Sequence, residues 1–259
     1  MRIMDRLART EPGNLRMHYY ADQVAIAASV DHRSFLGMLD TADREFLLSL
    51  GEPRTFRAGA RPIVQGDHSD TVFLVISGLV KVTVDTPEGR EVVLSLLGPG
   101  DLLGEFEIIE GGASVRMAGN VAVQRLDCLV IAGERFMTAL TSHPALALAL
   151  MRVLVGRLIS ADRRREASAS MDVGRSLASY LIELADRYGM AGESGIDVAF
   201  PLTQEELAGL ISCSRDSAVR GLGTLRTRGL IRTMRRRIVV TDLDGLRRFA
   251  SGQGHARLR

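Results

Sequence analysis

Cysteine is scarce in this chain of 259 residues, which contains only Cys128 and Cys213. The two lie in segments whose patterns indicate different domains, so no disulfide framework follows and the chain suits a reducing compartment. Two thiols also cannot supply the four thiolates that usually hold an iron–sulfur cluster. We therefore do not expect an oxygen sensor built on such a cluster.

Membrane spans, leader peptides and catalytic motifs are also lacking. The sequence has no run of eighteen apolar residues and no signal peptide, so we expect a cytoplasmic protein with no membrane partner. Its five His are scattered, and neither an HExxH motif, a P-loop nor a nucleophile–base pair occurs. We predict that the chain is not an enzyme and holds no metal or covalently bound cofactor. An enzyme or regulatory subunit that senses a nucleotide is the least supported alternative.

Positive charge is concentrated near the carboxyl end, although the net charge is only +2. The arginines of this cluster are Arg226, Arg228, Arg232, Arg235, Arg236, Arg237, Arg247 and Arg248. A domain that contacts phosphates requires such a cluster, so this region is a candidate for nucleic-acid binding.

The stretch from Thr203 to Ile231 predicts two short helices joined by a tight turn. Thr203 and Glu206 have the spacing of a capping box, which starts the first helix. Ser214 is a good N-cap for a second helix that runs to about Arg226. The helical period places three apolar residues of the second helix on its inner side. They are Val219, Leu222 and Leu225.

The other side of the second helix carries Arg215, Asp216, Ser217 and Arg220. Arginine can donate two hydrogen bonds to guanine, and aspartate can accept one from cytosine, so these residues are candidates for reading bases. The simpler alternative is an exposed helix with an ion pair between Asp216 and Arg220, four residues apart.

The segment CSRDSAVR, Cys213 to Arg220, resembles the signature of the family of the cyclic-AMP receptor protein and the fumarate-nitrate reductase regulator (CRP/FNR). The resemblance implies a winged helix-turn-helix in which the polar residues of the second helix read bases, while Thr203 and Ser214 contact phosphates. Ser212 departs from the family pattern, which often has Gly in this turn.

The segment LIRTMRRRIVVTD predicts a β-hairpin that would form the wing of this domain. Its tip would be Arg235, Arg236 and Arg237. The family usually turns on Gly here, and we interpret the three arginines as contacts to DNA phosphates.

Between Pro53 and Ile131, short apolar runs separated by Gly, Pro and Asp turns predict an antiparallel roll. In one of these strands, Val80, Val82 and Val84 would share one face, and Lys81, Thr83 and Asp85 the other. The motifs Gly66-Asp67, Ser77-Gly78-Leu79-Val80-Lys81 and Gly98-Pro99-Gly100-Asp101 are similar to those of a cyclic-nucleotide-binding jelly roll. The resemblance extends from about 50 to 250.

The resemblance also implies a nucleotide site. Gly104 and Glu105 match the family's Gly-Glu pair, whose Glu accepts a hydrogen bond from a ribose hydroxyl. Arg116 is the candidate for the cyclic phosphate. Met117 replaces the expected Ser or Thr and supplies no side-chain donor. Residues that reach the base in the family correspond to Ser160 to Asp162, where the family's residues are not preserved. The alternative is a structural ion pair between Glu105 and Arg116 in an empty roll.

After His143-Pro144 the sequence predicts one long helix. Leu148, Met151, Val155 and Leu158 follow the 3-4-3 spacing of a coiled-coil seam, which favours a homodimer. The alternative is that these residues belong to the core of a single chain.

These patterns predict an α+β protein with an extension at 1–30, a sensory β-roll at 31–142, a dimerisation helix and hinge at 143–170, and a winged helix-turn-helix at 171–250. We expect a homodimeric transcription regulator that binds palindromic operator DNA under the control of cAMP or cGMP, with RNA polymerase as a further partner. The alternative is the same regulator without nucleotide control, or with another effector such as a cyclic dinucleotide.

Overall fold

The computed structural model describes residues 30–68, 70–87, 89, 91–111, 115–169, 172–199, 202–234 and 236–252. Of the expected N-terminal extension, only Val30 is among them.

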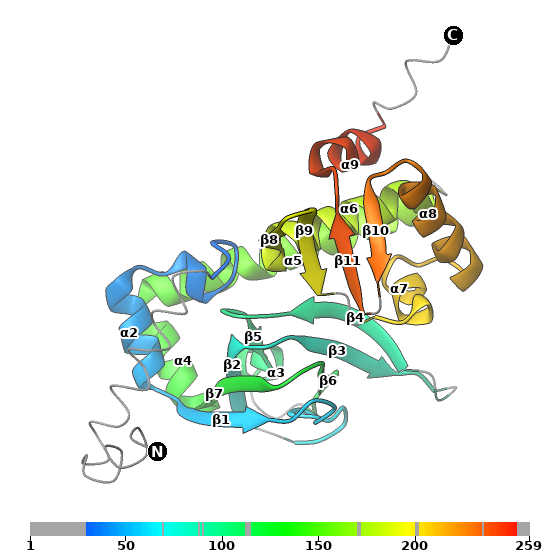
Figure 1. Cartoon of the computed structure of the whole chain (residues 1–259). Helices are drawn as coiled ribbons and strands as arrows, with labels where there is room; N and C mark the ends of the chain where they lie inside the picture. Colours follow the sequence, from blue (N-terminus) through cyan, green and yellow to red (C-terminus); the bar gives the residue numbers. More distant parts are fainter. Residues whose placement is uncertain are drawn as a thin grey trace, which may run out of the picture.

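Two antiparallel sheets form the first half of the chain, which confirms the predicted roll (Figure 1). One sheet has the order β1-β7-β2-β5 and the other β4-β3-β6. The strands are β1 (Glu52–Phe56), β2 (Thr71–Ser77), β3 (Val80–Asp85), β4 (Glu91–Leu97), β5 (Leu102–Leu103), β6 (Gly119–Ala122) and β7 (Leu126–Ala132). Short helices accompany them: η3 (Leu36–Met38), α2 (Thr41–Ser49), α3 (Glu105–Ile109) and α4 (Gly133–Ser142).

Both faces of β3 contain a buried side chain, since Val80 and Thr83 are both buried. The register with β4 shifts between Val82 and Thr83, and beyond this irregularity Thr83 is buried while Val84 is half-buried. The extra residue of this irregularity is Leu94 of β4, so β3 itself keeps its alternation, and Thr83 is buried on the face opposite the three valines.

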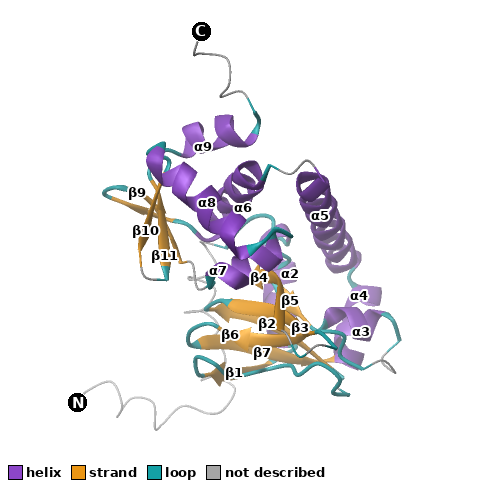
Figure 2. Cartoon of the chain, turned by 90° about the vertical axis from the view of Figure 1, so that its right-hand side faces the viewer, coloured by secondary structure: helices purple, strands orange, loops and turns teal. Residues whose placement is uncertain are grey.

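The long helix α5 (Pro144–Ala169) starts beside α4 at the edge of the roll and extends toward the second half of the chain (Figure 2). One of its faces is buried against the roll, and the residues of that face are Leu146, Ala149, Leu150 and Val153. The residues of the predicted seam lie on the face of α5 that is exposed to solvent.

The second half of the chain is a helical domain with a small sheet of order β10-β11-β9-β8. Its elements are α6 (Val173–Tyr188), β8 (Met190–Gly192), β9 (Gly195–Ala199), α7 (Gln204–Leu210), α8 (Arg215–Thr227), β10 (Ile231–Met234), β11 (Arg237–Val240) and α9 (Leu243–Ala250). Asp242 caps α9 by accepting from Gly245 N at 2.8 Å, and Leu246 of this helix is buried.

The two halves share a buried network at the end of α6. The guanidinium of Arg187 donates to both carboxylate oxygens of Asp101, at 2.7 and 2.8 Å, and to Asp31 at 3.0 Å. The hydroxyl of Tyr188 donates to Asp101 at 2.9 Å. The Tyr188 ring lies so close to Gly98 that a Cβ there would be 2.6 Å from it, which explains a glycine in this turn.

A second contact joins α7 to the roll. Val93 and Leu96 of β4 belong to the same hydrophobic core as Leu207 and Leu210 of α7. Beside this contact, Lys81 of β3 forms an ion pair with Glu206 of α7. The helix-turn-helix is therefore packed directly on the sheet that contains β4.

Candidate DNA-binding and nucleotide-binding sites

The first helix of the predicted pair begins at the expected capping box. The Thr203 hydroxyl accepts from Glu206 N at 3.1 Å, and the Glu206 carboxylate accepts from Thr203 N at 2.6 Å. Ser214 caps α8 by accepting from Ser217 N at 3.2 Å. Between the helices, Ser212 has a φ of 55°, in the left-handed region that favours glycine. This explains why a glycine is common at this position in the family.

The first turns of α8 present their polar residues to solvent. Arg215, Asp216 and Arg220 are exposed and Ser217 is half-buried. Arg220 donates to the Ser217 hydroxyl at 2.9 Å, and in the described part of the chain no ion pair joins it to Asp216. The proposed ion pair of the simpler alternative is therefore wrong. The acceptor and donor groups of this face stay accessible to base edges.

The inner side of α8 differs from the prediction. Ala218 and Leu225 are fully buried and Leu222 is partly buried, but Val219 is 39% exposed. The prediction was therefore wrong for Val219, which lies between the polar residues of the outer face. An exposed apolar side chain here is a candidate for contact with a thymine methyl group, and its position four residues after Arg215 was the available signal.

The wing is a hairpin of β10 and β11, as predicted, but its arginines differ in position. Arg235 lies outside the described residues, and Arg236 turns the chain with a φ of 58°. Arg237 is not at the tip, because it begins β11 and forms an ion pair of 3.1 Å with Asp197 of β9. An open groove of about 550 Å³ follows the wing. It is lined by Ser194, Arg226, Ile231, Arg232, Thr233, Met234, Arg237 and Val239.

In the roll, the candidate phosphate ligand Arg116 is buried and points inward. Its guanidinium donates to Gly104 O at 2.7 Å, to Thr71 O at 2.5 Å and to Glu107 Oε2 at 3.0 Å. A Cβ on Gly104 would lie 2.6 Å from the guanidinium, and the φ of this residue is 76°. A glycine is therefore required at position 104 for two reasons, the positive φ of the turn and the close approach of the Arg116 guanidinium.

The anion beside Arg116 is Glu107, not Glu105. The second oxygen of the Glu107 carboxylate accepts from Met117 N at 3.0 Å. Burial by itself raises the pKa of Glu107, but the hydrogen bonds from Met117 N and Arg116 outweigh it and hold the pKa below its usual value. The predicted alternative of a pair between Glu105 and Arg116 has the wrong partner.

Glu105 is instead joined to the long helix. Its buried carboxylate forms an ion pair with Arg157 of α5, which also donates to Leu102 O at 3.2 Å. Burial raises the pKa of Glu105, and the charge of Arg157 opposes this effect. Sequence reasoning missed Arg157, although a charged residue within an apolar helix was a visible signal.

The remaining candidates for nucleotide contact are Met117, Ser160 and Asp162. The Met117 side chain is exposed and only its backbone N–H is used by the pair described above. Ser160 is half-buried and Asp162 is exposed, both on α5. Ser160 follows Arg157 by three residues, which places the two on neighbouring positions of one helix face.

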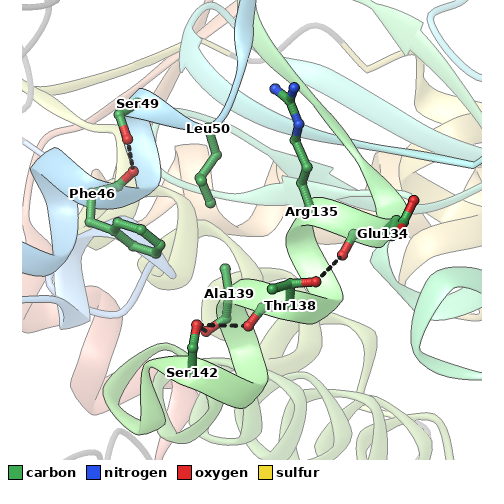
Figure 3. A pocket seen from close by; sticks show the side chains of 8 residues that line it. All are labelled: Phe46, Ser49, Leu50, Glu134, Arg135, Thr138, Ala139 and Ser142. Carbon is green, nitrogen blue, oxygen red and sulfur yellow. Dashed lines mark hydrogen bonds between the residues drawn. The ribbon is translucent and has the colours of Figure 1, made fainter.

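A separate open cleft of about 450 Å³ lies between α2 and α4 (Figure 3). It is lined by Phe46, Ser49, Leu50, Glu134, Arg135, Thr138, Ala139 and Ser142. None of the predicted site residues is among them.

The predicted seam of α5 is exposed. The exposed fraction is 44 to 60% for each of its four residues, Leu148, Met151, Val155 and Leu158. The segment Pro144–Asp162 is long and apolar enough, by length and composition alone, to cross a membrane. However, the same segment contains Arg152 and Arg157, and the latter is ion-paired with the roll. The outer face of α5 is an apolar surface that is unpartnered in a single chain.

Comparison with known proteins gives the class of both halves. A family model described as a cyclic nucleotide-binding domain matches residues 53–143, and one described as a Crp-like helix-turn-helix domain matches residues 176–249. The chain therefore joins a sensory domain to a DNA-binding domain, in the order predicted.

Several proteins that this chain resembles over most of its length are named as regulators. The CRP-like cAMP-activated global transcriptional regulator of Mycobacterium tuberculosis is 29% identical over 199 residues, 77% of this chain and 88% of that protein. The global nitrogen regulator of Synechocystis is 27% identical over 186 residues, 72% of this chain and 83% of that protein. The solved structure of the c-di-GMP responsive global regulator CLP of Xanthomonas campestris is 26% identical, with a TM-score of 0.63, and the match covers 78% of this chain and 99% of that one. The chain belongs to the CRP/FNR family of transcription regulators.

Proposed function

We propose that this regulator reads its operator through the exposed first turns of α8. The observation that supports this proposal best is the capped N-terminus of α8, where Arg215, Asp216 and Arg220 face solvent with Val219 among them. A recognition helix uses such a set of N-terminal residues in a major groove. Arg226, Arg232 and Arg236 near the wing supply positive charge for phosphates on either side of the groove.

The working unit in this proposal is a homodimer joined through the seam of α5. Four large apolar side chains with coiled-coil spacing and high exposure favour a second copy as their partner. Two recognition helices would then meet two half-sites of a palindrome about 34 Å apart. The division at 31–142, 143–170 and 171–250 remains a prediction within this proposal, as do a cytoplasmic location and RNA polymerase as a partner.

The effector in this proposal is a cyclic nucleotide, cAMP or cGMP, bound near Arg116. The alternative is regulation without a nucleotide or by a cyclic dinucleotide, and the ion pair between Arg116 and Glu107 favours it. An effector controls DNA binding only if it binds the DNA-competent state better than the other state.

The test compares Arg215→Ala with Arg236→Ala on DNA selected from a random library by the wild-type protein. Arg215→Ala should cost about 1 to 3 kcal/mol at one base-pair position and relax the choice there. Arg236→Ala should weaken binding to all sequences and lower the salt slope by about one. Arg135→Ala, an exposed arginine on α4, is the control and should change neither. An equal loss on every sequence for Arg215→Ala would refute its role in reading bases.

A further inference from the structure

Glu107 holds the position of an anion inside the roll. Its two carboxylate oxygens accept from two different donors, Arg116 Nη1 at 3.0 Å and Met117 N at 3.0 Å. In a phosphate site, a guanidinium can donate to one phosphate oxygen while a neighbouring backbone N–H donates to another. The carboxylate therefore already uses the donors that a phosphate would need.

The surroundings fit a permanent pairing. Both side chains are buried, with exposed fractions of 1% for Arg116 and 6% for Glu107. Arg116 is held on its other side by Gly104 O and Thr71 O, so its guanidinium is fixed in orientation. The lowered pKa of Glu107 keeps this carboxylate ionised at neutral pH.

We propose that Glu107 acts as a built-in competitor of the effector, occupying the phosphate position until a ligand displaces it. A cyclic phosphodiester and the Glu107 carboxylate each carry one negative charge, and two like charges beside one guanidinium repel each other. A nucleotide must therefore break two hydrogen bonds of Glu107 and move its charge before it reaches Arg116. The consequence is a raised effector threshold. This inference rests on the proposed nucleotide control of the roll.

The experiment is calorimetry of the full chain with cAMP and with cGMP as separate probes. Glu107→Ala removes the competing charge and should tighten binding roughly tenfold to hundredfold, the range expected when charged hydrogen bonds no longer have to be broken. Glu107→Gln keeps the size of the side chain and should give a smaller increase, so the test survives if the alanine variant folds poorly. Glu110→Ala, an exposed acidic neighbour at the end of α3, is the matched control and should bind as the wild type does.

Three results would overturn the proposal. One is equal affinity in the wild type and both Glu107 variants, and another is an absence of binding in all of them. The third is an equal gain in Glu110→Ala, which would indicate a general charge effect. Operator binding, measured on the same proteins, separates this inference from the proposed function. If the wild type binds its operator, the proposed function stands even when the Glu107 variants bind nucleotide as the wild type does. If the wild type does not bind operator DNA, the proposed function itself is refuted.

Discussion

The ion pair between Lys81 of the roll and Glu206 of α7 should couple the stabilities of the two domains. Its side chains are 15 and 16% exposed, so the pair lies between a surface pair and a buried one. Exposed pairs contribute about 0.2 to 1 kcal/mol, and breaking a buried pair costs about 3 to 5 kcal/mol. For Lys81→Met we therefore expect a loss of about 1 to 2 kcal/mol in the free energy of unfolding.

A double-mutant cycle isolates this interaction. Glu206→Gln removes the charge but keeps an oxygen that can accept from Thr203 N, so the capping box of α7 is retained. Urea unfolding of the wild type, the two single variants and the double variant should give a coupling energy of about 1 kcal/mol. The control cycle uses Arg61 and Glu91, an ion pair of 2.6 Å with exposed fractions of 43 and 29%, and should give less.

The pH dependence of the coupling has a defined sign. Burial by itself raises the pKa of Glu206, but hydrogen bonds from Lys81 and Thr203 N outweigh it and lower the pKa. A carboxylate with a lowered folded pKa stabilises the protein fully above its unfolded pKa of about 4.3, and this contribution is lost as pH falls through the folded pKa. The coupling should therefore persist at neutral pH and fade in acid. A coupling energy below about 0.3 kcal/mol at pH 7 would refute the argument that this contact joins the domains.

Two further predictions concern single side chains. Ser214→Ala removes the N-cap of α8 and should lower the free energy of unfolding in urea by about 1 kcal/mol. The control, Ser179→Ala on the exposed face of α6, should leave this free energy unchanged. Equal effects of the two substitutions would mean that the cap does not stabilise the protein. Burial raises the pKa of Cys128 to about 12, and the charge of Asp127 acts in the same direction. A thiol reagent should therefore label the native protein only at the partly exposed Cys213. Denaturation should make Cys128 reactive as well. Native labelling of a Cys213→Ser variant would contradict the burial of Cys128.

Much of the DNA-binding half was predictable because its signals are local. At the start of α7, the side chains of Thr203 and Glu206 each accept from the backbone N–H of the other, and the Ser214 hydroxyl accepts from Ser217 N at the start of α8. Such bonds close within one helical turn, so the residue types and their spacing are sufficient to recognise them. The failure at Val219 has a local reason too, since small residues such as Ala218 and Gly221 form the inner face where helices approach closely.

The roll was predictable as a fold and not as a site. Strand periodicity and turn residues indicated the two sheets, but no residue pattern marked the extra residue in β4, Leu94, where the register with β3 shifts. The partner of Arg116 was equally hidden. Glu105 and Glu107 are both acidic and both near in sequence, and only the course of α3 determines which carboxylate reaches the guanidinium.

The sequence by itself determined the order of the domains, the capped helices of the helix-turn-helix and the apolar seam of α5, because each depends on residues within a few turns of one another. Tertiary structure alone decided how charges pair between distant segments. Lys81 meets Glu206 across 125 positions, and Glu105 meets Arg157 across 52. Ion pairs of this kind have no period along the chain, since they form only where folding brings two buried charges to the same place and each must find a partner there.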